Sequence, residues 1–381
     1  MPIADRMQDF GTTVFAEFTR LAAEHRAINL GQGFPDFDGP ELLRDVAAEA
    51  LRTKSNQYAP TNGIPALTGA IAVDWRTRTG IEVDPGASVT VTCGCTEAIA
   101  ASLLGLLNPG DEVILFEPFY DSYRACIALA GATPRFVTLR WPDFRFDPDE
   151  LRAAIGPRTR AILVNTPHNP TGRVFDADEL HLIASLCMEH DLVAITDEVY
   201  EHLVYDGEHT SLATLPDMAE RTIVLSSLGK TFSLTGWKIG WAIAPPALSA
   251  AVRAAHQFLT FAISPALQHG AVAALHSPAS YYHDLRGMLR SRRDLLIGAL
   301  EDIGLTVSRP AAGYFVMADH GSFDEDDVTF CTRLIRECGV AAIPPSFFYA
   351  NPEHGRALVR FAFCKQEATL REAAARLAQL H

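Results

Sequence analysis

Short apolar runs alternate with segments of helical period between residues 88 and 244. The apolar runs lie at 88–92, 113–116, 135–139, 161–165, 192–196, 222–225 and 239–244. Between most of them the helical period recurs, as at 97–107, 121–130 and 177–190. Buried strands that alternate with helices form mainly parallel sheets with helices on both faces. The sequence therefore predicts an α/β fold with a mainly parallel seven-stranded sheet.

The pattern changes near residue 275, where a second, smaller unit is predicted. An arginine-rich helix at 281–303 and a last helix at 366–380 are expected to enclose strands at 305–308, 314–318 and 358–363. Residues 1–30 have the pattern of an amphipathic helix. A chain of 381 residues is long enough for two cores. We predict a large domain at 41–275, a small α+β domain at 276–381, and an N-terminal segment at 1–40 that joins the small domain.

Composition excludes several classes of protein. A net charge of −14 argues against nucleic acid or an anionic membrane as the main partner. The N-terminus lacks the pattern of a secretory signal, and no apolar run approaches a membrane span. The seven cysteines are odd in number and scattered, which is typical of reduced thiols in a cytoplasmic protein. Neither they nor the 13 histidines have the spacing of a metal site, so no metal is expected.

The segment 226–241 reads SSLGKTFSLTGWKIGW and directly follows an apolar strand. A lysine at the end of a buried strand is partly desolvated, which lowers its pKa and makes its amine a nucleophile. Lys230 has this position, and Lys238 adds a second cation eight residues later. A phosphate-binding loop of the G-x-x-x-x-G-K-[ST] type is excluded because Val224 stands where it requires glycine. An ordinary surface lysine remains the alternative for Lys230 alone.

In sheets of this type ligands bind beyond the carboxyl ends of the strands. The helix start after the first strand, at 93–98, is either an anion site or an ordinary capped terminus. Tyr120 follows the second strand and could lie flat on a planar heterocycle or belong to the core. Asn165 and Asn169 follow the fourth strand. Asp197, at a buried strand end, needs a cationic or protonated partner.

Taken together, these strand ends supply one set of groups. They are an anion site, an aromatic face, an amide, a carboxylate with a nearby tyrosine, a lysine nucleophile and a second cation. A phosphorylated pyridine aldehyde requires all of them. Each group taken alone has a structural explanation at least as good, so the prediction depends on their combination.

These motifs resemble class I aminotransferases of fold type I, which use pyridoxal 5′-phosphate (PLP). The likeness covers essentially the whole chain and is strongest to the subgroup of kynurenine–oxoglutarate, methionine and N-succinyldiaminopimelate aminotransferases. It is carried by NLGQGFPDF at 29–37, NQY at 56–58, EPFYDSY at 117–123, NTPHNP at 165–170, TDEVY at 196–200, the segment around Lys230, AIPPS at 342–346 and VRF at 359–361.

The resemblance implies a role for each residue of a cofactor site. Lys230 would form the Schiff base with PLP and move the substrate proton, and Asp197 would hold the pyridine nitrogen protonated. Tyr200 and Asn169 would bond the ring oxygen. The remaining cofactor residues implied are the stacking Tyr120, the phosphate ligands Gly94, Cys95, Thr96, Ser227 and Lys238, and Asn165.

The resemblance also implies a substrate pocket and a partner. Arg360 would bind the α-carboxylate with Asn169 and the amide of Gly33. Tyr58 would reach the phosphate of a neighbouring subunit, which implies a homodimer. An aromatic pocket is expected from Phe15, Tyr120, Phe261, Phe347 and Tyr349. Phe15 and Ala262 stand where kynurenine aminotransferases have tryptophan and histidine, which weighs against kynurenine as the substrate.

The predicted protein is a cytoplasmic, PLP-dependent aminotransferase. Its donor would be an apolar or aromatic amino acid such as methionine, or N-succinyldiaminopimelate, and its acceptor a 2-oxo acid. A dicarboxylic substrate would require a second arginine at the pocket, for which Arg173 and Arg292 are candidates. A PLP-dependent C–S β-lyase, or another biosynthetic PLP enzyme, is the alternative because it would use the same cofactor residues.

Overall fold

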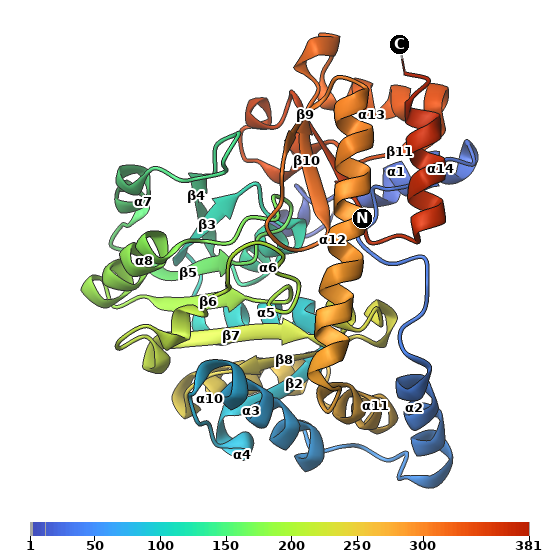
Figure 1. Ribbon diagram of the computed structural model, residues 1–381. Coiled ribbons are helices and arrows are strands. Elements are labelled where there is room, and N and C mark those ends of the chain that lie inside the picture. Colours follow the sequence, from blue (N-terminus) through green and yellow to red (C-terminus); the bar gives the residue numbers. More distant parts are fainter. Residues whose placement is uncertain (1–2, 12, 381) are drawn as a thin grey trace.

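The computed structural model describes residues 3–11 and 13–380, and its main feature is a seven-stranded sheet (Figure 1). The strand order is β2-β8-β7-β6-β5-β3-β4. Neighbours from β4 to β7 pair in parallel, and β8 runs antiparallel to both of its neighbours. The predicted mainly parallel sheet is therefore confirmed. The strands are β2 (Val89–Cys93), β3 (Glu112–Glu117), β4 (Thr133–Thr138), β5 (Thr159–Asn165), β6 (Val193–Asp197), β7 (Thr222–Ser227) and β8 (Ile239–Ile243).

Both faces of this sheet are covered, and β3 shows how. Its residues Val113 and Leu115 belong to one core with helices α5 and α6, whereas Ile114 and Phe116 belong to another with α7 and α8. Successive side chains of a strand point to opposite faces. A strand that is buried on both faces is therefore continuously apolar, as the sequence of β3 is.

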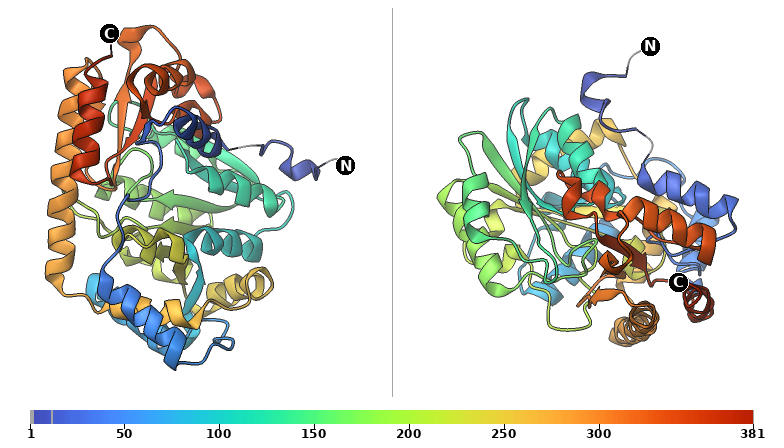
Figure 2. Two further views of the ribbon diagram at one scale, coloured as in Figure 1. Left: turned by 90° about the vertical axis from the view of Figure 1, so that its right-hand side faces the viewer. Right: turned by 90° about the horizontal axis from the view of Figure 1, so that it is seen from above.

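The helices around the sheet form two layers (Figure 1, Figure 2). Helix α10 packs on α5, and α11 packs on both α2 and α3. A third core joins α3 and α11 to strands β2 and β8. The helices of this part are α2 (Glu41–Thr53), α3 (Pro65–Thr79), α4 (Pro85–Ser88), α5 (Gly94–Leu106), α6 (Asp121–Leu129), α7 (Pro148–Ala154), α8 (Ala177–Glu189), α9 (Leu228–Thr231), α10 (Pro246–Leu259) and α11 (Pro265–Leu275).

The C-terminal part contains a smaller antiparallel sheet of order β12-β10-β9. Its strands are β9 (Thr306–Ser308), β10 (Phe315–Asp319) and β12 (Leu358–Ala362), with helices α13 (Asp327–Arg333) and α14 (Glu367–Leu377) beside them. Helix α12 (Ala279–Asp302) runs along one side of the molecule past both sheets (Figure 1). These elements match the α+β pattern predicted for this part.

The N-terminal segment lies against the C-terminal part. Strand β1 (Ile28–Asn29) pairs in parallel with β11 (Val340–Ala341). The helix predicted over 1–30 is too long, because α1 spans only Val14–Glu24 and a short 3₁₀ turn covers Asp5–Met7. Thr13 begins α1 by accepting a hydrogen bond from the amide of Ala16. Residues 1, 2 and 12 of the predicted range lie outside the described part.

None of the helices in the described part combines the length and the apolarity needed to cross a bilayer.

Candidate active site

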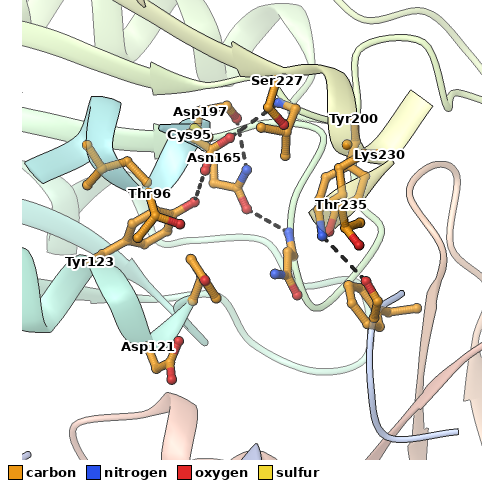
Figure 3. A pocket seen from close by; sticks show the side chains of 18 of the residues that line it. Cys95, Thr96, Asp121, Tyr123, Asn165, Asp197, Tyr200, Ser227, Lys230 and Thr235 are labelled. Carbon is orange, nitrogen blue, oxygen red and sulfur yellow. Dashed lines mark hydrogen bonds between the residues drawn. The ribbon is translucent and has the colours of Figure 1, made fainter. Parts of the chain in front are cut away.

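A cavity of about 340 Å³ lies where the large sheet meets the N-terminal segment and β12 (Figure 3). It is lined by residues from both halves of the sequence. They are Phe15, Gln32, Gly33, Gly94, Cys95, Thr96, Ile99, Tyr120, Asp121, Tyr123, Asn165, Asn169, Asp197, Val199, Tyr200, Ser227, Gly229, Lys230, Thr235, Lys238, Ile239, Phe315 and Arg360.

Three neighbouring parallel strands bring polar side chains to one wall of this cavity. Asn165, Asp197 and Ser227 are the last residues of β5, β6 and β7. In the register of the sheet Asn165 lies opposite Asp197. Because parallel strands end at the same edge, these side chains meet there. The expectation that ligand-binding residues follow the carboxyl ends of the strands holds for this wall.

Asp197 is a buried carboxylate held by hydrogen bonds. The hydroxyl of Tyr123 donates to its Oδ2 at 2.7 Å, and the amide of Val199 donates to Oδ1 at 3.2 Å. Burial raises the pKa of Asp197, while the hydrogen bonds from Tyr123, Val199 and the thiol of Cys95 act in the opposite direction. An ionised carboxylate here is suited to a cationic or protonated partner in the cavity.

Lys230 projects from α9, the single helical turn that follows β7. Burial lowers the pKa of its amine, although the nearby groups of Cys364 and Asp197 oppose the shift. Its Nζ donates to the carbonyl of Gly33 at 3.4 Å and lies 5.4 Å from the centre of the Tyr314 ring. A buried lysine with a lowered pKa has a larger fraction of neutral, nucleophilic amine at neutral pH.

The N-terminus of α5 forms a concave cradle for an anion. The helix begins at Gly94, three residues before the predicted start, and Gly94 has a φ of +70°. A Cβ at Gly94 would lie 3.0 Å from Nζ of Lys238. That Nζ is 3.5 Å from Oγ1 of Thr96. Free amides at a helix N-terminus, together with a lysine, favour a phosphate group.

Two asparagines connect this wall to the opposite one. Asn165 donates through Nδ2 to the carbonyl of Asp197 at 2.8 Å, and its Oδ1 accepts from the amide of Asn169 at 2.7 Å. The Oδ1 of Asn169 accepts from Nη1 of Arg360 at 3.4 Å. The side chain of Asn169 is thereby directed toward Arg360 and away from the sheet.

Arg360 is the cation of the opposite wall. It lies on β12, is 2% exposed, and its guanidinium carbon is 4.2 Å from the Phe315 ring centre and 5.1 Å from that of Phe15. Burial lowers the pKa of Arg360 to about 10. Nη2 donates to the carbonyl of Gly31 at 2.8 Å, whereas Nε has no hydrogen-bond partner in the described part. A buried guanidinium with an unused donor is suited to a carboxylate ligand.

The loop between β1 and α2 passes between Arg360 and Lys230. The carbonyl of Gly33 accepts from the hydroxyl of Tyr314 at 2.7 Å as well as from Lys230. A Cβ at Gly33 would lie 2.4 Å from the Phe315 ring, so only glycine fits there. The side chain of Asn29 accepts from the amides of Gly31 and Gln32, which holds this loop in one conformation.

Most of the predicted site residues line this one cavity, but four do not. Tyr58 and Phe261 lie outside it and contact each other edge to face at 5.1 Å. Tyr58 is 84% exposed and Phe261 46%. Their proposed roles at a neighbouring subunit and in the pocket stay predictions. Phe347 and Tyr349 are also absent from the lining, and the first is half exposed while the second is buried.

Neither arginine considered for a dicarboxylic substrate reaches the cavity. Arg173 pairs with Glu179 at 2.5 Å, and Arg292 stacks over the ring of Phe37 at 4.8 Å. The cations of the cavity wall, within the described residues of this chain, are therefore Lys230, Lys238 and Arg360. The described residues also contain no group of three or more histidine, cysteine, aspartate or glutamate side chains arranged to hold a metal ion.

Sequence reasoning assigned no role to several residues of the wall. Tyr123 lies in the first turn of α6, and only the fold brings it to Asp197. Phe315 belongs to a predicted strand, but the strand pattern does not distinguish a core position from a cavity position. Gln32 and Asp121 lie in the motifs at 29–37 and 117–123 that carry the family resemblance. A polar residue directly beside Gly33 or Tyr120 could have marked them as site residues.

Comparison with known proteins gives a consistent result. The family model described as Aminotransferase class I and II matches residues 25–377. A probable N-succinyldiaminopimelate aminotransferase of Mycobacterium tuberculosis is 48% identical over 98% of both chains. The methionine aminotransferase of Escherichia coli is 41% identical over 98% of this chain and 97% of its own. The solved structure of the M. tuberculosis N-succinyldiaminopimelate aminotransferase covers all of both chains with a TM-score of 0.96 and 47% identity.

Proposed function

The chain belongs to the class I and II aminotransferases and is a PLP-dependent enzyme that transfers amino groups, and we propose that its donor is an apolar or aromatic L-amino acid such as methionine, or N-succinyldiaminopimelate. The acceptor is a 2-oxo acid. The observation that carries this proposal is the joint presence of Lys230, Asp197 and Arg360 on the wall of one cavity. The names of the two bacterial relatives support these donors.

The residues of the cavity fit PLP. The cradle at Gly94 is open because that residue has no Cβ, and Lys238 and Thr96 stand beside it for a phosphate. Asp197 offers a buried carboxylate for a protonated ring nitrogen. Tyr120 lines the same space and has a face for the ring. We therefore propose that the N-terminus of α5, Ser227 and Lys238 would hold the phosphate and that Tyr120 would contact the ring.

PLP supplies an electron sink that stabilises negative charge at the α-carbon of a bound amino acid. The protein supplies the proton movement and the orientation. Nζ of Lys230 would take the proton from the α-carbon and return it on the cofactor side. The lowered pKa of Lys230 suits this task because the amine must accept a proton near neutral pH. Asp197 would keep the ring nitrogen protonated, and the hydroxyl of Tyr200 and the side-chain amide of Asn169 would hold the ring oxygen.

Arg360 would orient the amino acid by its α-carboxylate. A guanidinium binds a carboxylate through two parallel hydrogen bonds, and the unpartnered Nε provides one donor for such a pair. The side chain of Asn169 and the amide of Gly33 lie on the same wall and would assist. Three phenylalanine rings surround the guanidinium and exclude water from it, which strengthens the ion pair.

The proposal extends to assembly and location. Tyr58 and Phe261 form an exposed aromatic pair, and Phe258, three residues before Phe261, is 86% exposed. An exposed aromatic patch of this kind favours an interface with a second copy of the chain, in which Tyr58 would reach the neighbouring phosphate. All seven cysteines are free in the described part, which supports a cytoplasmic location. The boundaries of the two domains are proposed at residues 40 and 275.

The test is the visible absorption of the purified protein during addition of single amino acids. We expect methionine or N-succinyldiaminopimelate to remove the band of bound PLP and a 2-oxo acid to restore it. Lys230→Ala should abolish this exchange, whereas Lys54→Ala, at an exposed lysine outside the cavity, should retain it. If no donor removes the band reversibly and a cysteine conjugate releases pyruvate and ammonia, the protein is a C–S β-lyase and transamination is refuted.

A further inference from the structure

Asp121 is a charged residue of the cavity wall to which the proposed function gives no task. The charged residues that line the cavity are Asp121, Asp197, Lys230, Lys238 and Arg360. In the proposed function Asp197 pairs with the ring nitrogen and Lys238 with the phosphate of the cofactor. Lys230 acts on the α-proton, and Arg360 binds the α-carboxylate. Asp121 has no role in this scheme. A carboxylate in a partly buried site nevertheless interacts strongly with any charged ligand beside it.

The carboxylate of Asp121 has few partners within the chain. The amide of Ser122 donates to it, and the charge of Arg360 acts on it from a distance. These interactions lower the pKa of Asp121, but burial has the larger effect and raises it. No ion pair joins Asp121 to another side chain in the part of the chain that the structure describes. Its charge is thus available to a molecule in the cavity.

The position of Asp121 corresponds to the side chain of a bound amino acid. It is the first residue of α6 and directly follows Tyr120. Figure 3 shows it on the side of the cavity away from Lys230, beyond Thr96 and Tyr123. Because Lys230 and Arg360 fix the α-carbon and the α-carboxylate, the side chain is directed to the rest of the wall. Among the lining residues that have no role toward the cofactor, the α-carbon or the α-carboxylate, Asp121 is the charged one.

We propose that Asp121 is a specificity residue that disfavours donors with a short side-chain carboxylate and favours those with an N–H group at that point. This inference rests on the proposed function. A second carboxylate would lie beside Asp121 without a free cation of this chain, since Arg173 and Arg292 lie elsewhere. Discrimination of this kind needs a repulsive element, and Asp121 provides it.

The alternative is that Asp121 only stabilises the N-terminus of α6 through the helix dipole. Asp178 has the same kind of position in α8, in the first turn, but it is exposed and lies outside the cavity. Asp178→Asn is therefore the matched control for Asp121→Asn. Both variants remove one first-turn carboxylate, and only one of them changes the charge of the cavity.

The experiment compares glutamine with glutamate, which differ only in the amide that replaces the carboxylate. For the wild type we expect kcat/KM to be at least about tenfold higher with glutamine. Asp121→Asn should lower this ratio by about tenfold. Asp121→Glu and Asp178→Asn should retain the wild-type ratio.

A wild type that uses glutamate as well as glutamine overturns the inference without any variant, and so does an unchanged ratio in Asp121→Asn. A second measurement needs no substitution: succinamate should shift the visible band at concentrations about tenfold lower than succinate does. Equal affinities overturn the proposal. If neither methionine nor N-succinyldiaminopimelate removes the band, the proposed function itself has failed, which is a different outcome.

Discussion

The hydrogen bond from Tyr123 to Asp197 gives the sharpest test of how this site holds its cofactor. Tyr123→Phe removes one hydroxyl, and the ring keeps its place in the core against Cys126 and Ile127. The bond is 2.7 Å long and both residues are buried. Its loss leaves one oxygen of the Asp197 carboxylate without that donor, and burial already raises the pKa of this residue.

The size of the effect follows from the type of bond. A hydrogen bond to a charged group contributes about 1.5–3 kcal/mol. One pKa unit corresponds to about 1.4 kcal/mol, so the variant should raise the pKa of Asp197 by about one to two units. Only the ionised carboxylate pairs with a protonated ring nitrogen. As the pH is lowered, the affinity of the variant for PLP should therefore begin to fall at a higher pH than that of the wild type.

The assay is the titration of the cofactor-free protein with PLP at a series of pH values. At each pH the dissociation constant of the variant is divided by that of the wild type. This ratio cancels the effect that the titration of PLP itself has on binding. We expect this ratio to exceed one at low pH and to fall toward one as the pH rises. Tyr205→Phe is the control, because it removes a buried hydroxyl that donates to the carbonyl of Gly313 away from the cavity. A ratio that does not change with pH would refute the reasoning.

Two further predictions concern the helix that carries the cradle. A Cβ in Gly240→Ala would lie 2.5 Å from the amide nitrogen of Cys95, so we expect weaker PLP binding and a loss of about 1–3 kcal/mol in unfolding free energy. Gly298→Ala is the control, because no atom lies near its Cβ, and it should cause neither effect. Equal shifts in the melting temperature of the two variants would contradict this prediction. Burial acts to lower the pKa of His256, but the hydrogen bond and charge of Glu97 outweigh it and raise the pKa. The native state then binds a proton that the unfolded chain releases above about pH 6.5, so this stabilisation is full below that pH and is lost as the pH rises through the folded pKa. Denaturant unfolding of His256→Gln should show a weaker decline with pH than the wild type, and an identical decline would show that another group is responsible.

Local patterns were sufficient to predict the sheet and the residues at the ends of its strands. A strand that is buried on both faces is a continuous apolar run, so its last residue can be read directly, as with Asp197 and Asn165. The start of α5 was placed too late because glycine and threonine are poor helix formers, and Gly94 in the left-handed region gives no periodic signal.

Contacts between distant segments could not be predicted in this way. Tyr123 and Asp197 are separated by 74 residues, and Arg360 and Gly31 by 329. Whether two such residues meet depends on strand order and on the path of the N-terminal segment, which no local pattern specifies. The same reason explains why the part of the exposed Tyr58 in an assembly stays a prediction.

The loop between β1 and α2 has a consequence for the order of events in catalysis. The carbonyl of Gly31 accepts a hydrogen bond from Nη2 of Arg360, and the carbonyl of Gly33 accepts one from Nζ of Lys230. A carboxylate that bound Nη2 of Arg360 would compete with the carbonyl of Gly31 for that donor. Movement of Gly31 would shift the carbonyl of Gly33, two residues later, which accepts from Nζ of Lys230. If the substrate carboxylate binds Arg360 as proposed, its binding would be coupled to the position of the Gly33 carbonyl beside Lys230.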